Sequence, residues 1–298
     1  MKKMYVLLAV FVCGLTVGLQ AKAEEATKAV AGEWKDLLDK TLSQWRIYQS
    51  YELKNGYNGG KIVDADGNAV QPIGYDRNVK DVFTVVDEDG EPVLHITGEV
   101  YGCVFTRQDF RNYHFRMKMR WGSKKWEPRL NDALDSGLLY HSQGECGVDY
   151  WQSWMLAHEF QVCEETNGEY WTIAHSQIEV RAKKEGDTWI FDPEAEKVRL
   201  GAGSGNSGHC LMSANAEKPM GEWNELELIC YKGKSLHIVN GEVVMAISGL
   251  YYWDGNKAQS LDEGKLQLQS EAGEVFYKDI WIKEIDGIPE QYRHYFAE

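Results

Sequence analysis

Residues 114–121 read HFRMKMRW, and this stretch indicates the fold class of the chain. Apolar side chains, beginning with Phe115 and ending with Trp121, alternate in it with His114 and three basic residues. A period of two places one set of side chains on a buried face and the other in water, as in a half-buried antiparallel strand.

The same alternation recurs along most of the chain. Further strands are expected in residues 82–86, 93–100, 136–141, 159–163, 226–228, 236–238, 266–269 and 276–285. Asn240-Gly241 lies between two of them and suits a two-residue hairpin loop, which needs positive φ angles. Helical periodicity is scarce, with one short helix expected within residues 24–42. Short strands and 29 glycines predict an all-β, two-sheet antiparallel sandwich of the jelly-roll type.

The first 23 residues resemble a cleaved signal peptide. Lys2 and Lys3 precede an apolar stretch at residues 4–19, and Ala21-Lys22-Ala23 has the form that signal peptidase cuts. An uncleaved anchor and a lipoprotein at Cys13 are the alternatives. We therefore expect a periplasmic or secreted protein without a membrane span, built as a single sandwich domain over residues 24–298 with a core at about 34–285.

The composition excludes several function classes. The 298 residues carry a formal net charge of −14, which argues against nucleic-acid partners because phosphate neutralisation needs a basic surface. Five cysteines remain beyond Cys13, and none are spaced as CxxC, so we predict neither a structural zinc site nor a defined disulfide. The sequence does not identify a protein partner, and that question stays open.

Three apparent cofactor motifs lack their required context. Residues 203–208 fit GxGxxG, but no helix is expected to follow them. His158-Glu159 begins like HExxH, yet Val162 occupies the position of the second ligand. Residues 64–66 and 87–89 read as acidic turns, with a lone surface calcium left open. We expect no cofactor and no metal site from these motifs.

The richest stretch for chemistry is residues 150–175. In its strand, Glu159 and Gln161 share one face, about 6.7 Å apart by the strand rise, while Phe160 and Val162 point into the core. Four aromatic residues surround this strand and suit the apolar faces of a sugar ring: Trp151, Trp154, Tyr170 and Trp171. The alternative is that these rings fill the core and that Glu159 is solvated.

Two other strands would add polar groups to the same surface. In residues 136–141, SGLLYH, Leu139 and His141 share a face, and further along the chain Gln269 and Glu271 alternate with leucines. If these strands join the sheet of Glu159, its exposed face gathers carboxylates, amides and an imidazole. Each of these residues alone could equally be an ordinary solvated strand residue.

The ordered set of motifs resembles the 3-keto-disaccharide hydrolase family, whose members are similar to concanavalin A-like glucanases and lectins. The motifs that carry the resemblance follow Trp45: SGLLYH (136–141), HEFQVCE (158–164), GEWN (221–224), HIVNG (237–241), LQLQSE (266–271) and VFYKDIWIKEI (275–285). The resemblance covers about residues 34–285. It implies an exported bacterial enzyme acting on glycosides oxidised at the sugar 3-position, with a small carbohydrate as its ligand.

The family comparison leaves two mechanisms open. Sandwich glucanases carry E-x-D-x-E on one strand, but here Cys163 replaces the last carboxylate, so Glu271 or Glu164 would have to complete a pair. For a 3-keto sugar, a single base can instead start an elimination. We then expect Glu159 as the base, Gln161 orienting the sugar, and either His141 or Arg107 facing the enolate oxygen. A divalent metal is an alternative in that last role.

Two other function classes compete with the enzyme. A non-catalytic carbohydrate-binding sandwich would use the aromatic residues to hold glycans and would tolerate the loss of Glu159. A structural surface protein would need neither a groove nor clustered carboxylates. Turnover of a 3-keto-glycoside would distinguish the enzyme from the carbohydrate-binding module and from the structural protein.

Overall fold

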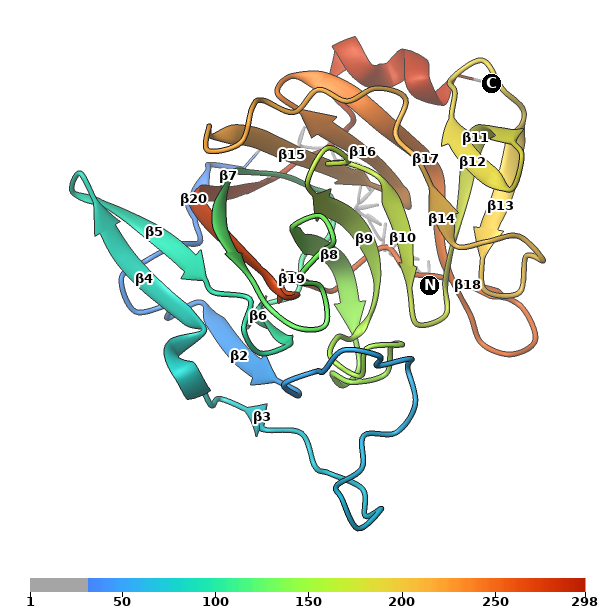
Figure 1. Cartoon of the computed structure of the whole chain (residues 1–298). Helices are drawn as coiled ribbons and strands as arrows, with labels where there is room; N and C mark the ends of the chain where they lie inside the picture. Colours follow the sequence, from blue (N-terminus) through green and yellow to red (C-terminus); the bar gives the residue numbers. More distant parts are fainter. Residues whose placement is uncertain (1–31, 298) are drawn as a thin grey trace, which may run out of the picture.

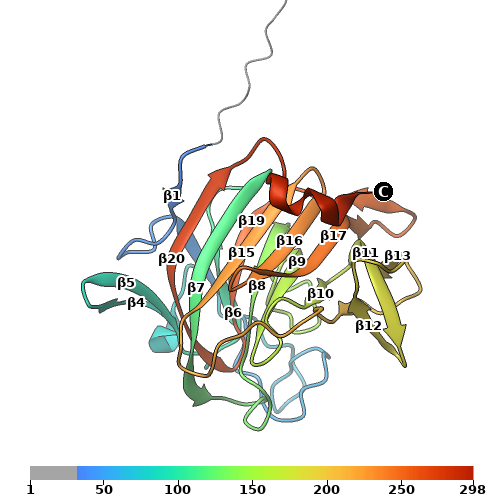
Figure 2. The ribbon, with the colours of Figure 1, turned by 90° about the horizontal axis from the view of Figure 1, so that it is seen from above.

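The computed structural model describes residues 32–297, which form two antiparallel β-sheets packed face to face (Figure 1). The proposed signal peptide and the first part of the expected helix lie outside the described residues. Seen from above, β20, β7, β15, β16 and β17 run side by side in one layer, with β19, β8 and β9 behind them (Figure 2). The two-sheet sandwich of the jelly-roll type is confirmed.

The larger sheet has twelve strands in the order β12-β11-β17-β16-β15-β7-β20-β5-β4, with β1, β13 and β18 attached at its sides. Its strands are β1 (Lys35–Asp36), β4 (Phe83–Glu88), β5 (Glu91–Ile96), β7 (Tyr113–Lys125), β11 (Ser176–Glu185), β12 (Thr188–Phe191), β13 (Lys197–Gly201), β15 (Asn224–Tyr231), β16 (Lys234–Val239), β17 (Glu242–Trp253), β18 (Ala258–Ser260) and β20 (Gly273–Glu284).

The smaller sheet has eight strands in the order β14-β10-β9-β8-β19-β6-β2-β3. They are β2 (Trp45–Gln49), β3 (Gly74–Tyr75), β6 (Gly102–Thr106), β8 (Asp135–Gln143), β9 (Leu156–Cys163), β10 (Tyr170–Ile173), β14 (His209–Cys210) and β19 (Lys265–Ser270). Two 3₁₀ helices, η1 (Val79–Asp81) and η2 (Glu290–Phe296), complete the described part.

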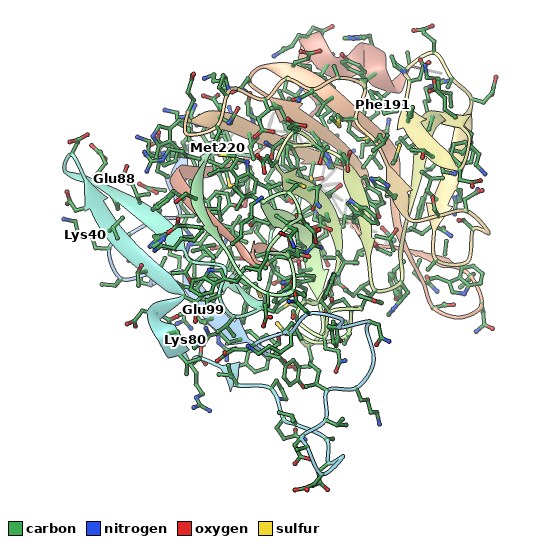
Figure 3. The ribbon with its side chains drawn as sticks, in the orientation of Figure 1. Lys40, Lys80, Glu88, Glu99, Phe191 and Met220 are labelled. Carbon is green, nitrogen blue, oxygen red and sulfur yellow. The ribbon has the colours of Figure 1, made fainter. Side chains whose placement is uncertain are left out.

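Side chains fill the space between the sheets (Figure 3). The inward residues of HFRMKMRW, such as Phe115 and Met117, pack there against Phe160 of the opposite sheet. A second apolar cluster covers the outer face of the smaller sheet and includes Phe105 and Leu139. The smaller sheet is therefore buried on both faces, so polar groups on its outer face are removed from bulk water.

The hairpin prediction is confirmed, and the helix prediction is wrong for residues 32–42, the part of the expected helix that the structure describes. Asn240 and Gly241 have φ angles of 50° and 84° and connect β16 to β17. Residues 32–42 contain β1 and turns but no helix. The cause is local, because the carboxylate of Asp36 accepts a hydrogen bond from the amide of Leu38, and Asp39 accepts from Thr41, which favours turns over helix.

No helix in the described part of the chain is long and apolar enough to span a membrane.

Replacing Gly241 by Ala should lower the free energy of unfolding by roughly 1–2 kcal/mol, because an L-residue is strained at positive φ. The site is otherwise open, since nothing lies within 4 Å of the added methyl group. Urea denaturation measures the loss. Gly287→Ala is the control, with open space and no positive φ; an equal loss in both variants would contradict the conformational explanation.

Candidate active site

A cavity of about 600 Å³ opens on the outer face of the smaller sheet. Its lining comes from strands β8, β9 and β10, from the segments on either side of β8, from the connection between β9 and β10, and from the residues that follow β10 and β19. Its lining residues are Arg129, Asp135, Asp149, Tyr150, Trp151, Trp154, Glu159, Gln161, Cys163, Thr166, Glu169, Trp171, Thr172, Ile173, Ala174 and Glu271.

Strand β9 turns its two predicted polar residues into this cavity. Glu159 and Gln161 line it, whereas Phe160 and Val162 lie in the core between the sheets. The alternation follows from the strand period of two. The side chain of Glu159 is nevertheless almost fully enclosed, because the whole residue is only 4% exposed.

A glycine in β8 leaves the room that these polar side chains occupy. Gly137 pairs with Gln161 on one side, and Gln269 lies beside it on the other. A Cβ atom at Gly137 would collide with the side-chain oxygens of Glu159 and Gln269. The missing side chain therefore allows the carboxyl group and the amide to lie together over the middle of the sheet.

Arg129 holds two of the cavity's carboxylates. Its Nη1 lies 2.6 Å from Oδ2 of Asp135, and its Nη2 lies 2.7 Å from Oε1 of Glu271. The guanidinium carbon is 5.2 Å from the ring centre of Trp151, which packs on it. Gln161 donates from Nε2 to the other oxygen of Asp135 at 3.0 Å. Arg129 is the one cationic residue among those that line the cavity.

The three carboxyl groups of this cluster, Asp135, Glu159 and Glu271, all have a raised pKa. Burial is the largest cause for each group, and neighbouring negative charges add to it, so the pKa of Asp135 is raised to about 6. The pKa of Glu159 is raised well above its usual value of 4.5. No ion pair of the described residues includes Glu159. A single guanidinium cannot balance three buried charges, so the cluster favours keeping a proton, and Glu159 is the carboxyl group of the three that lacks an ion pair with Arg129.

Several other predicted residues lie at the same place. Trp151, Trp154, Trp171 and Glu271 line the cavity, and Gln269 lies beneath it against Gly137. Tyr170 does not reach it. Its ring lies between the sheets, where its hydroxyl is 3.0 Å from Nδ1 of His158.

The placement predicted for His141 and Arg107 is wrong. The β8–β9 register shifts between Tyr140 and Gln143, and His141 has a φ of 54°, so its ring turns toward Tyr113 between the sheets. Its Nδ1 lies 3.1 Å from the carbonyl oxygen of Leu261. Arg107 follows β6, and its Nε donates to the carbonyl of Ser43 at 2.9 Å, outside the cavity.

Glu164, the alternative partner considered for Glu159, is also outside the cavity. Its carboxylate accepts a hydrogen bond from the amide of Leu134 at 3.1 Å. Of the two partners considered for Glu159, Glu271 is therefore the one that lines the same cavity.

The sequence reasoning missed Arg129, Asp135 and Glu169. Asp135 was detectable, because it precedes SGLLYH by one residue and shares a face with Gly137 and Leu139 in a period of two. Arg129 lies in the connection between β7 and β8, where no periodicity predicts the direction of a side chain. Within residues 32–297, no group of three histidine, cysteine, aspartate or glutamate side chains is arranged to hold a metal ion.

Residues 33–283 match the model of the 3-keto-alpha-glucoside-1,2-lyase-like domain. The chain belongs to this family. The resemblance seen in the motifs is therefore confirmed, and it places this 3-keto-alpha-glucoside-1,2-lyase-like domain among glycosyl hydrolase-like, carbohydrate-active proteins. No curated protein sequence matches the chain at a significant level.

Similar solved structures share little sequence with this lyase-like domain. A candidate glycosyl hydrolase from Parabacteroides distasonis ATCC 8503 is 16% identical, with 85% of this chain and 100% of that one covered and a TM-score of 0.44. Domain 4 of the extracellular arabinanase AbnA from Geobacillus stearothermophilus is 9% identical, with 86% and 100% covered and a TM-score of 0.36. A non-specific endo-beta-1,3(4)-glucanase is 13% identical, with 86% and 91% covered and a TM-score of 0.40.

Replacing Glu159 by Gln should stabilise the fold at neutral and higher pH. Since the folded-state pKa of Glu159 lies above its usual value of 4.5, the wild type loses stability as pH rises from about that value through the folded pKa. The neutral amide avoids this loss, so the gain should be small near pH 4.5 and reach about 1–3 kcal/mol above the folded pKa. Thermal or urea unfolding across pH measures it.

The matched control is Glu194→Gln, an exposed glutamate far along the chain from the cavity strands. It should leave the pH dependence unchanged. A Glu159→Gln variant that is less stable than the wild type at every pH would contradict the assignment of Glu159 as the carboxyl group that lacks a compensating cation.

Proposed function

We propose that this protein cleaves 3-keto-α-glucosides by a base-catalysed elimination in which Glu159 is the base. The observation that carries the proposal is the side chain of Glu159, enclosed in a sugar-sized cavity, with a raised pKa and no ion pair among the described residues. The family description, which names a 1,2-lyase of 3-keto-alpha-glucosides, supports the same class of reaction.

The ketone makes the chemistry possible. A carbonyl at C3 acidifies the proton on C2, so a carboxylate can remove it and leave an enolate over C2, C3 and O3. The enolate reforms the C3 carbonyl, its electron pair becomes the C1–C2 double bond, and the bond from C1 to the aglycone oxygen breaks. The departing oxygen takes up a proton. Addition of water across C1–C2 would then give net hydrolysis.

Glu159 is better suited to the base than its neighbours. Asp135 and Glu271 are both paired to Arg129, which stabilises their charged forms and weakens them as bases. Glu159 lacks such a pair, and burial raises its pKa well above the usual 4.5, so its carboxylate accepts protons more readily than that of an ordinary glutamate. After the first step it holds the proton that the leaving oxygen requires.

Arg129 takes the role that sequence reasoning gave to His141 or Arg107. Its guanidinium is the cationic group on the cavity wall, and its ion pairs with Asp135 and Glu271 fix its orientation. A fixed cation next to the sugar ring stabilises the negative charge that develops on O3 during proton removal. Gln161, held by Asp135, would orient the sugar hydroxyls.

The buried charge cluster favours an enzyme over a non-catalytic sugar-binding module. A binding site can hold sugar hydroxyls with neutral amides and aromatic rings, and it gains nothing from a buried carboxyl group that lacks a counter-ion. Perturbed titratable groups in a cleft are typical of catalytic sites.

Purified protein should release the aglycone from a 3-keto-α-glucoside and leave the parent glucoside intact, because only the ketone acidifies C2. Glu159→Gln should lower kcat by at least about a hundredfold, since general base catalysis contributes that much or more. Chromatography of the released aglycone measures both results. Glu164→Gln is the control, because Glu164 directly follows β9 but lies outside the cavity, and this variant should retain activity. Equal cleavage of the parent glucoside would refute the elimination.

The pH profile of kcat/KM should have its acidic limb above the usual pKa of a glutamate, because Glu159 must lose its proton to act. The charge of Glu271 raises the pKa of Glu159, so Glu271→Gln should move this limb to lower pH. Initial rates across pH measure the shift. An acidic limb that moves to higher pH in Glu271→Gln would contradict the proposed effect of Glu271 on the pKa of Glu159. An acidic limb that stays the same in both Glu271→Gln and Glu159→Gln would contradict it as well.

A further inference from the structure

We infer that Trp171 forms the subsite for the leaving group and that this subsite takes an uncharged sugar ring. The inference rests on the proposed function, which it extends from the cleaved sugar to the aglycone. Trp171 lies directly across the β9–β10 ladder from Glu159, so the two side chains emerge side by side on the cavity wall.

The ring of Trp171 is held in place from behind. The imidazole of His209 stacks on it with ring centres 3.9 Å apart and an angle of 13° between the planes. His209 is itself fixed, because its Nε2 lies 2.9 Å from Oε2 of the buried Glu169. His209 does not line the cavity, whereas Trp171 does, so the indole presents a surface to the cavity that its neighbours keep in one orientation.

The aromatic residues of the cavity differ in exposure. Trp154 is buried, with 1% exposed, and Trp151 packs on Arg129, while Trp171 and Tyr150 are 39% and 56% exposed. Of the two exposed rings, Trp171 is the one paired with Glu159 across β9 and β10, whereas Tyr150 packs edge-on against Trp151. The reacting sugar has to contact Glu159 and Arg129, so it belongs at the enclosed end of the cavity. The aglycone must leave after cleavage, which places it at the open end, against Trp171. A flat indole suits the C–H face of a second pyranose ring.

The charges around the cavity select against an anionic aglycone. Five carboxyl groups line it, those of Asp135, Asp149, Glu159, Glu169 and Glu271, against the single guanidinium of Arg129. The chain as a whole carries a formal charge of −14. A uronate or phosphate on the leaving sugar would lie in this negative field with no free cation to pair with, whereas a neutral hexose would not be repelled.

The test measures equilibrium binding in the Glu159→Gln background, where turnover does not consume the ligand. A 3-keto-α-glucosyl-glucose disaccharide should bind at least about tenfold more tightly than methyl 3-keto-α-glucoside, a difference of about 1.4 kcal/mol. Adding Trp171→Ala should abolish this difference and change the dissociation constant of the methyl glycoside by less than about twofold. Trp171→Phe, which keeps a ring, should lie between, and His209→Ala should lose part of the preference.

Trp189→Ala is the control, because Trp189 lies on β12 and packs outside the cavity. It should leave both dissociation constants unchanged. A disaccharide whose aglycone is glucuronic acid should bind more weakly than the neutral one, and equal or tighter binding would overturn the assignment of an uncharged ring.

The failure of this inference can be told from the failure of the proposed function. If the wild type cleaves both 3-keto ligands but a folded Trp171→Ala variant keeps the preference for the disaccharide, the subsite is refuted and the reaction stands. If the wild type cleaves neither ligand while Trp171→Ala still abolishes the preference in binding, the reaction is refuted and the subsite stands.

Discussion

The site depends on one electrostatic constraint: three buried carboxyl groups share a single guanidinium. Arg129 pairs with Asp135 and Glu271, and Glu159 remains without a cation of its own. In water these groups would all ionise and repel weakly. In the enclosed cavity, burial and neighbouring negative charges raise the pKa values of Glu159 and Glu271. These carboxyl groups therefore keep a proton to higher pH than glutamates on an open surface do. The same arrangement destabilises the fold and, in the proposed elimination, supplies the base, which is a trade expected of a catalytic site.

The sheet creates this constraint because it is covered on both faces. The core between the sheets packs Phe160 and Val162, while the second apolar cluster, with Phe105 and Leu139, excludes water from the opposite face around Glu159. Gly137 then leaves the space that the side chains of Glu159 and Gln269 occupy over the middle of β8. Any larger residue at position 137 would force the carboxyl group or the amide away from the sheet, so the electrostatic cluster and the backbone geometry are inseparable.

Much of the architecture was predictable because it follows local rules. The period of two in residues 114–121 and 159–163 gave strands and the correct inward and outward directions of their side chains, and Asn240-Gly241 gave a hairpin. His141 failed because a register shift in β8 breaks the alternation that the prediction assumed. Arg129 was missed for a different reason. It comes from an irregular connection, and only the three-dimensional path of that connection brings it to Asp135, six residues later in the chain.

The positions of Arg129 and Trp171 give the proposed site a direction. Trp151 packs on Arg129, whereas Trp171, backed by His209, lies beside Glu159 with a partly exposed ring. A substrate bound in the reverse sense would place its variable leaving group among the buried charges and its ketone away from the guanidinium. In the proposed elimination the enolate requires a cation and the leaving group requires an exit. Both requirements favour the same orientation, with the bond to be cleaved over β9 between Arg129 and Trp171.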